Sequence, residues 1–235
     1  MNRRRLPEAE IERIRCERYH PRPTQHDYLH LKGLLGKLQE VFQEIPVAGG
    51  PALDLYCGTQ PYREIIPWRP LWGLDKDLHF GRADVVAHEA LPFKDGAFPV
   101  VTCTQALCVV YDPQRTVDEM FRVMTPGGYV VATVARMFRR EVPHQRRFSS
   151  QELDDLFAKW ADVRVQGIGG PGAGFAFVVA SFAAAAARRW RVFGPLLPPI
   201  ALTLNGLGAT LDLLLGRLSR RWPACIMVVA RRPDG

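Results

Sequence analysis

Between positions 54 and 84, acids and a glycine stand where short apolar runs end or begin. Asp54 lies near the end of one run and Gly58 follows it, so the backbone can turn close to a ligand while the carboxylate accepts hydrogen bonds from backbone groups or a cationic amine. Asp75 ends the next run, where its two oxygens can accept both hydroxyls of a ribose, or alternatively cap a turn. Asp84 opens the third run, and a carboxylate there can receive the amino group of a base.

The elements that must position these residues alternate short apolar runs with helical patterns from about residue 50, which is typical of β-α-β units that build a parallel sheet. In an open sheet of this kind, ligands bind beyond the carboxyl ends of the strands, so the loop after the first strand is the expected site. The fold class predicted is α/β, with helices on both faces of the sheet. The predicted strands are 52–56, 71–74, 84–87, 100–104, 129–134 and a closing strand, 224–230.

Helices are predicted over 113–124, opened by Asp112 and closed by the Pro126-Gly127-Gly128 turn, and from the Ser149 cap to about residue 160. Residues 1–49 show helical spacing on either side of a proline-rich turn, which predicts an N-terminal helical cap. Residues 50–235 are predicted to form the ligand-binding domain, with a helical insertion at about 172–220 before the last strand.

Two uncharged segments, 165–187 and 192–211, are long enough to raise the question of membrane spans. The first begins with a glycine-rich stretch, and the second contains three prolines, Asn205 and two glycines, which suit a membrane span poorly. We therefore expect buried or interfacial helices that form a lid or a homodimer face. Peripheral contact with a membrane surface is the alternative.

Bulk composition describes an ordinary globular protein, because 47% of the 235 residues are apolar and 23% are charged. The basic N-terminus is not followed by an apolar signal region, so no secretory signal is predicted. Five scattered cysteines without a CxxC pair favour a reduced, cytoplasmic setting and no metal site. The net charge of +7 permits binding to a polyanion, but the dispersed arginines favour a solvated basic surface, so nucleic acid is not the expected partner.

The linked order of these features resembles the type 11 group of class I S-adenosylmethionine (SAM) dependent methyltransferases, relatives of the quinone-biosynthesis methyltransferases. The resemblance implies a Rossmann-like sheet with an antiparallel final strand, SAM as cofactor, and transfer of a methyl group to a small or lipid-like acceptor molecule. The matching pieces cover roughly residues 50 to 165 and stand as ALDLYCGTQPYR, WGLDKD, ADVV, EALPFKDGAF, VVTCTQALCVVYDP, EMFRVMTPGGYVVATV and RRFSSQELDDLF.

The resemblance also assigns roles around the cofactor. The methionine end of SAM would lie against Asp54 and Gly58, the ribose against Asp75, the adenine between Asp84 and Val85, and the sulfonium beside Gln105. The remaining residues expected to bind the cofactor are Tyr56, Tyr62 and Lys76.

Three departures from the family pattern bear on this site. Tyr56 and Gln60 stand where the family usually has glycine, Pro99 where it usually has aspartate, and Cys108-Val109 where many members have Glu-His. A side chain at Tyr56 or Gln60 must point away from the ligand or contact it, because added atoms beside a close backbone approach are costly. A degenerate site, in a non-catalytic partner protein of the same fold, is therefore an alternative.

Methyl transfer from an activated sulfonium requires chiefly alignment of the acceptor and exclusion of water, so a dedicated base need not exist. For an acceptor that must lose a proton, we predict His20 and His144 as catalytic groups. The residues expected to bind the acceptor are Tyr19, Tyr111, Arg146 and Arg147.

A second alternative function is RNA methylation. The net positive charge favours it, but the sequence has no stripe of basic residues with interleaved aromatic residues, which opposes it. A nicotinamide dehydrogenase lacks support, because the loop has no GxGxxG set.

Overall fold

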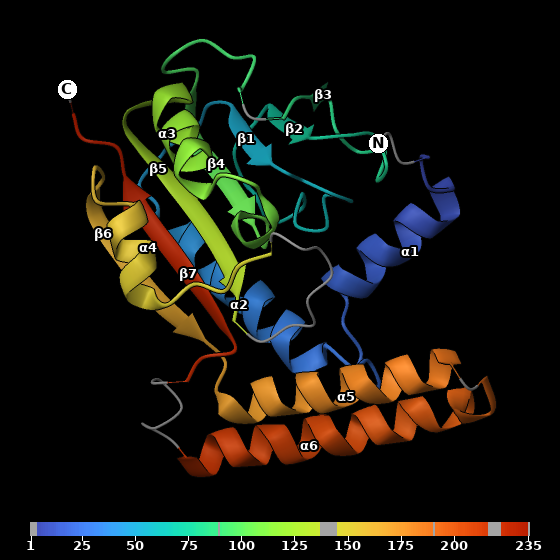
Figure 1. The fold of residues 1–235 in the computed structure, drawn as a ribbon. Coiled ribbons are helices and arrows are strands. Elements are labelled where there is room, and N and C mark those ends of the chain that lie inside the picture. Colours follow the sequence, from blue (N-terminus) through green and yellow to red (C-terminus); the bar gives the residue numbers. More distant parts are fainter. Residues whose placement is uncertain (1–3, 89, 137–144, 190, 216–221, 235) are drawn as a thin grey trace.

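The structure, a computed structural model, describes residues 4–88, 90–136, 145–189, 191–215 and 222–234 of the chain. A twisted seven-stranded sheet forms its centre, in the order β3-β2-β1-β4-β5-β7-β6 (Figure 1). The strands are β1 (Ala52–Leu55), β2 (Leu71–Asp75), β3 (Val85–Val86), β4 (Phe98–Thr104), β5 (Met124–Ala135), β6 (Ala161–Ile168) and β7 (Cys225–Arg231).

The sheet is mostly parallel, and only β7 runs antiparallel to its neighbours β5 and β6. This confirms the predicted fold class, including the antiparallel final strand. The strand order reverses between β1 and β4, so the loops at the carboxyl ends of these strands form the expected ligand crevice.

Helices cover both faces of the sheet because its strands bury side chains on both sides. On one face, α2 (Tyr28–Glu44) packs Leu34, Leu38 and Val41 against strand residues. On the other, α3 (Pro113–Val123) and α4 (Ser150–Leu156) cover the strands, while α1 (Glu8–Tyr19) lies beside the carboxyl edge of the sheet (Figure 1).

Local signals explain most helix boundaries. The Asp112 side chain accepts from Arg115 N at 3.0 Å and starts α3, and Ser149 forms a capping box with Glu152 at the start of α4. The predicted end of α3 lies one residue from the observed end at Val123, but the helix passes directly into β5, so the Pro-Gly-Gly turn lies inside that strand. The predicted end of α4 near residue 160 was wrong, because α4 ends at Leu156.

Pro99, one of the departures from the family pattern, lies where the pairing of β4 with β5 shifts register between Phe98 and Val100. Proline has no N–H to donate to a sheet ladder, and an irregularity of this kind tolerates it. The substitution therefore fits the sheet and leaves its topology intact.

After β6 the chain forms an antiparallel hairpin of α5 (Pro171–Arg189) and α6 (Leu197–Leu215), joined by the short helix η2 (Arg191–Leu196). Figure 1 shows the hairpin along one end of the molecule, with α5 facing the sheet domain and α6 outermost. By length and composition, Gly194–Leu215 alone among the described segments could cross a membrane, and 17% of its most apolar window is buried. Burial, one of the outcomes expected for this segment, therefore does not hold for α6.

Candidate functional site

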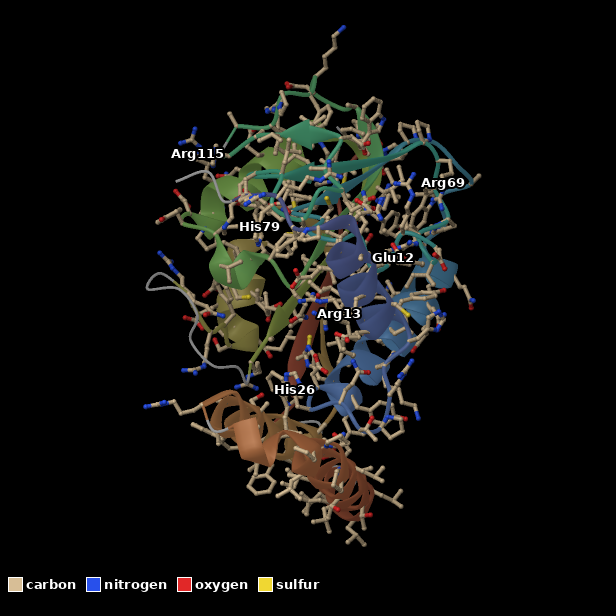
Figure 2. The ribbon with its side chains drawn as sticks, turned by 90° about the vertical axis from the view of Figure 1, so that its right-hand side faces the viewer. Glu12, Arg13, His26, Arg69, His79 and Arg115 are labelled. Carbon is tan, nitrogen blue, oxygen red and sulfur yellow. The ribbon has the colours of Figure 1, made fainter. Side chains whose placement is uncertain are left out.

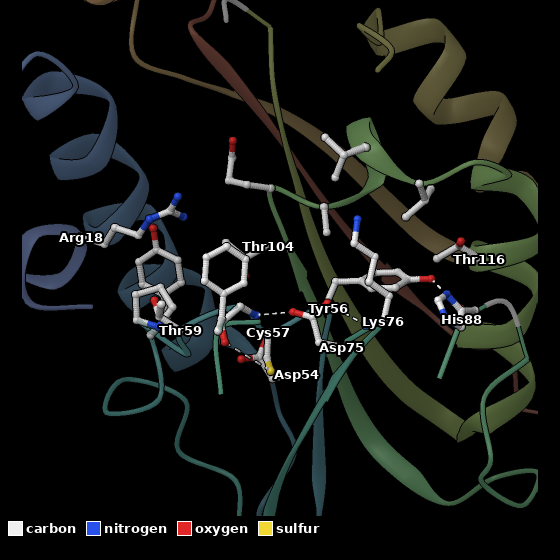
Figure 3. Close-up of a pocket in the computed structure, with 18 of the residues that line it drawn as sticks. Arg18, Asp54, Tyr56, Cys57, Thr59, Asp75, Lys76, His88, Thr104 and Thr116 are labelled. Carbon is white, nitrogen blue, oxygen red and sulfur yellow. Dashed lines mark hydrogen bonds between the residues drawn. The ribbon is translucent and has the colours of Figure 1, made fainter. Parts of the chain in front are cut away.

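A cavity of about 650 Å³ opens at the carboxyl ends of β1, β2 and β4, beside α1 and the loop that contains the short helix η1 (Leu107–Val109) (Figure 3). Its volume lies in the range of small-molecule sites. Its position coincides with the point where the strand order reverses, which is the place that the sequence predicted.

The loop after β1 follows a path that favours glycine at every second residue. Backbone φ is +56° at Tyr56, +55° at Gly58 and +49° at Gln60, all in the left-handed region. A residue with a Cβ pays about 1 kcal/mol or more to adopt this conformation. The backbone of the turn is thus kept although two of its expected glycines are replaced.

The side chains of these two residues take opposite directions. Gln60 is buried away from the cavity and packs so closely on β2 that a Cβ on Gly73 would lie 2.3 Å from its Nε2 atom. Tyr56 lines the cavity, and its hydroxyl donates to the carbonyl oxygen of His88 at 2.9 Å (Figure 3). Tyr56 therefore forms a wall that bridges the loops after β1 and β3.

Asp75 ties the loop after β1 to the end of β2. Its Oδ2 accepts from Gly58 N at 2.9 Å and its Oδ1 from Lys76 N at 2.7 Å. Burial raises the pKa of Asp75, and the two backbone donors oppose this shift. Each carboxylate oxygen has two lone pairs, so the group can also accept ligand hydroxyls.

Asp54 lies at the bottom of the cavity and is buried. Burial raises its pKa to about 7, while the Thr102 hydroxyl, which donates to Oδ1 at 3.0 Å, lowers it. Because this pKa lies above the ordinary value, ionising Asp54 opposes folding as the pH rises from about 4 towards 7. A bound cation would offset that cost.

Two further polar groups in the cavity lining complement an anion. Tyr62 is buried in the cavity lining, and its hydroxyl has no hydrogen-bond partner among the described residues. Arg18 of α1 also lines the cavity and opposes the burial effect that raises the pKa of Tyr62 to about 12. A ligand with an amino-acid end can therefore bind its ammonium at Asp54 and place its carboxylate near Tyr62 and Arg18.

Gln105 follows β4 in a left-handed conformation, with φ of +59°. Its backbone N and its Nε2 donate to Thr133 Oγ1 at 3.0 and 3.1 Å, and its side chain also interacts with His30 of α2. Burial lowers the pKa of His30, which keeps the ring neutral at pH 7. Gln105 is thus fixed at the cavity by the neighbouring strand and by α2.

The structure brings part of the predicted site together. Asp84 instead accepts from Gly73 N at 2.7 Å and connects β2 to the start of β3. His20 is exposed and contacts the Tyr19 ring, Arg147 lies in a separate small hollow, and His144 lies outside the described residues. The predicted residues that line the cavity are Asp54, Tyr56, Gly58, Tyr62, Asp75, Lys76, Gln105 and Tyr111; those that do not are Asp84, Val85, Tyr19, His20, Arg146 and Arg147.

Several lining residues were missed from the sequence, including Arg18 and His88. A signal for Arg18 exists, because Ile11, Ile14 and Arg18 follow one another at helical spacings of three and four. Ile11 is buried, and the other two line the cavity. His88 carries no such signal, since it lies in a loop after β3.

Comparisons with known proteins agree with this architecture. A family model described as a methyltransferase domain matches residues 74–132. The chain is 32% identical to a demethylmenaquinone methyltransferase of Clavibacter sepedonicus, over 37% of this chain and 41% of that protein. The matched region therefore spans less than half of the relative.

Solved structures share the fold at low identity. A SAM-dependent methyltransferase of Thermotoga maritima superposes with a TM-score of 0.56 at 17% identity, covering 94% of this chain and 95% of that one. The [4+2]-cyclase SpnF superposes with a TM-score of 0.55 at 19% identity, covering 85% and 81%. The fold is that of the class I methyltransferases. The family-model match agrees with the resemblance found in the sequence motifs over residues 74–132.

Proposed function

We propose that this chain, with its class I methyltransferase fold, is a SAM-dependent methyltransferase that acts on a small or lipid-like acceptor. One observation carries the proposal: buried Asp54, Asp75 and the Gly58 turn meet in one cavity at the reversal of strand order. The methyltransferase-domain match over residues 74–132 supports it independently.

The lining residues support binding of the methionine and ribose portions of SAM. Asp54 accepts the ammonium of the methionine portion, and the unpartnered hydroxyl of Tyr62, with Arg18, receives its carboxylate. Asp75 accepts the ribose hydroxyls, and the Tyr56 ring covers one side of the nucleoside. With Tyr56 holding His88 and Gln60 turned away, the two replaced glycines are compatible with a bound cofactor.

When bound, SAM would supply an activated methyl group on its sulfonium and would leave as S-adenosylhomocysteine. The chain's contribution is to align the acceptor and exclude water. Tyr111 lines the cavity and remains a residue proposed to bind the acceptor. A catalytic role for His20 has no support from its exposed position outside the lining, and His144 stays a sequence-based proposal.

A lipid-like acceptor is supported by the name of the curated relative, which acts on a demethylmenaquinone, and by the apolar lining from Phe80, Val109 and Val110. None of the described hairpin residues lines this cavity, so a lid formed by the hairpin has no support. Arg146 and Arg147 lie outside the lining, so an anionic acceptor has no support from them. The cytoplasmic setting remains a prediction.

Methyl transfer can be tested by measuring S-adenosylhomocysteine formed from SAM with detergent-solubilised phenol and quinol acceptors. We expect turnover by the full chain, loss of turnover in Asp54→Asn, and normal turnover in the control Asp154→Asn, which changes an exposed carboxylate outside the cavity lining. SAM binding without turnover on any acceptor would favour a cofactor-binding protein with another activity, a possibility that the likeness to a [4+2]-cyclase raises. Absence of SAM binding would favour the non-catalytic partner protein.

A further inference from the structure

The outer helix of the C-terminal hairpin has inverted polarity. A surface helix of a water-soluble domain buries its leucines and exposes its charged residues. In α6 the buried residues are Ala201, Asn205 and Gly208, whereas Leu207, Leu213 and Leu214 are 63%, 82% and 77% exposed. Figure 2 shows that the side chains on the outward side of the hairpin are predominantly carbon.

Small residues hold the two helices of the hairpin together. A Cβ on Gly208 would lie 2.6 Å from the carbonyl oxygen of Gly172, so the backbones cross in close contact. Along α5, Ala176, Ala180 and Ala184 are buried at intervals of four residues. Packing through small residues, with larger apolar side chains left outside, is typical of helices surrounded by lipid.

The polar groups of α6 are used internally. Asp212 is the only charged residue between positions 192 and 216, and its carboxylate accepts from the backbone N atoms of Gly170, Gly172 and Ala173 at the start of α5. Asn205 donates to the carbonyl oxygens of Pro23 and Gln25. The outward face of α6 therefore presents no charge to its surroundings.

The flanks of this apolar helix are basic and aromatic. Arg189 and Trp222 are exposed on either side of it, and the sequence adds arginines at 188, 191, 217, 220 and 221. Arginine and tryptophan at both ends of an apolar segment are typical of segments that sit at the boundary between lipid headgroups and hydrocarbon. A second copy of the chain would explain the leucines but not these flanks.

The orientation of the hairpin follows from its attachment to the domain. The Phe177 ring of α5 stacks on His26 and His30 of the α2 region, with ring centroids 6.2 and 5.6 Å apart. Figure 2 labels His26 at this junction. Because one long side of the hairpin is held against the domain, α6, about 28 Å long for its 19 residues, is free only on its outer side.

We propose that the α5–α6 hairpin anchors the protein to one leaflet of an anionic bilayer, with α6 lying along the surface and its leucines inserted below the headgroups. The leucines supply the insertion, and the flanking arginines select anionic lipid. This inference is independent of whether the cavity transfers a methyl group.

Flotation of the full chain with vesicles of equal parts phosphatidylglycerol and phosphatidylcholine tests the proposal, with no cofactor added. We expect the chain to float with the vesicles and to remain bound at high salt, since insertion is apolar, whereas purely electrostatic adsorption is screened. Leu207→Glu and Leu214→Glu should each weaken partitioning about tenfold or more. Both sites are exposed, and circular dichroism checks that the variants fold.

The matched control is Val86→Glu, which adds the same charge at an exposed apolar residue on the β3 edge. It should leave flotation nearly unchanged. The proposal is overturned if the wild-type chain does not float, or if the control loses binding as strongly as the leucine variants. It is also overturned if the leucine variants leave flotation intact and convert a dimer to a monomer in analytical ultracentrifugation, because the face would then bind a second copy.

Discussion

Replacing Tyr56 with glycine separates the two effects of this unexpected side chain. The substitution relieves about 1 kcal/mol of left-handed strain at φ of +56°. It also removes the hydrogen bond to His88 at 2.9 Å, worth about 1 kcal/mol, and a partly buried ring that packs against the core. Since gains and losses nearly offset, we expect a net loss of unfolding free energy of only about 1 to 2 kcal/mol.

The same substitution should also weaken the binding of SAM. A ring against a nucleoside contributes roughly 1 to 3 kcal/mol, so Tyr56→Gly should weaken SAM affinity about fivefold or more. Tyr56→Phe keeps the ring and loses only the hydrogen bond, so its affinity should stay near that of the wild type. Gln60→Gly relieves similar strain on the side away from the cavity and should not change affinity.

Calorimetric titration with SAM, together with thermal unfolding of each variant, measures both quantities. If Tyr56→Gly binds SAM as tightly as the wild type or more tightly, the Tyr56 ring does not contribute to binding of the nucleoside. If Gln60→Gly weakens binding to the same extent, the effect comes from the backbone of the loop.

Asp75→Asn should weaken SAM binding by about 1 to 3 kcal/mol in titration, because a charged acceptor is lost; unchanged affinity would mean that the ribose binds elsewhere. Because the Asp54 pKa is about 7 and its carboxylate form binds the ligand ammonium, affinity should fall about tenfold per pH unit below 7, and Asp54→Asn should abolish that slope. Gly208→Ala should lower the unfolding free energy by roughly 2 kcal/mol or more, because its Cβ meets Gly172 O at 2.6 Å. Gly206→Ala, with nothing within 4 Å, should raise it by up to about 1 kcal/mol, and equal shifts in thermal unfolding would argue against the close crossing of the hairpin helices.

Elements with a strong local signal could be predicted from the sequence. The spacing of Leu34, Leu38 and Val41 fixed the buried face of α2, and the Ser149 cap with Glu152 marked the start of α4. β6 was missed. Val163 and Val165 alternate with polar residues, which is typical of an edge strand. However, the uncharged stretch that begins at residue 165 was assigned to a separate segment, and this assignment divided the strand.

The site was only partly predictable because side-chain direction is a tertiary property. Asp54 and Asp75 were found since they end strands that converge on one edge of the sheet. Asp84 lies before β3 and not at the end of a strand, and its carboxylate accepts a hydrogen bond from Gly73 N. The opposite directions of Tyr56 and Gln60 depend on what lies beside each residue, which spacing along the chain does not encode.

The measurement that tests the central claim most directly is calorimetric titration of the full chain with SAM and with S-adenosylhomocysteine, in wild type and Asp54→Asn. The account predicts saturable binding of both ligands with a micromolar Kd, about 8 kcal/mol of binding free energy, and a clear loss in the variant. A folded wild-type sample that binds neither ligand, or a variant that binds both as tightly, would contradict the assignment of this cavity as a SAM site.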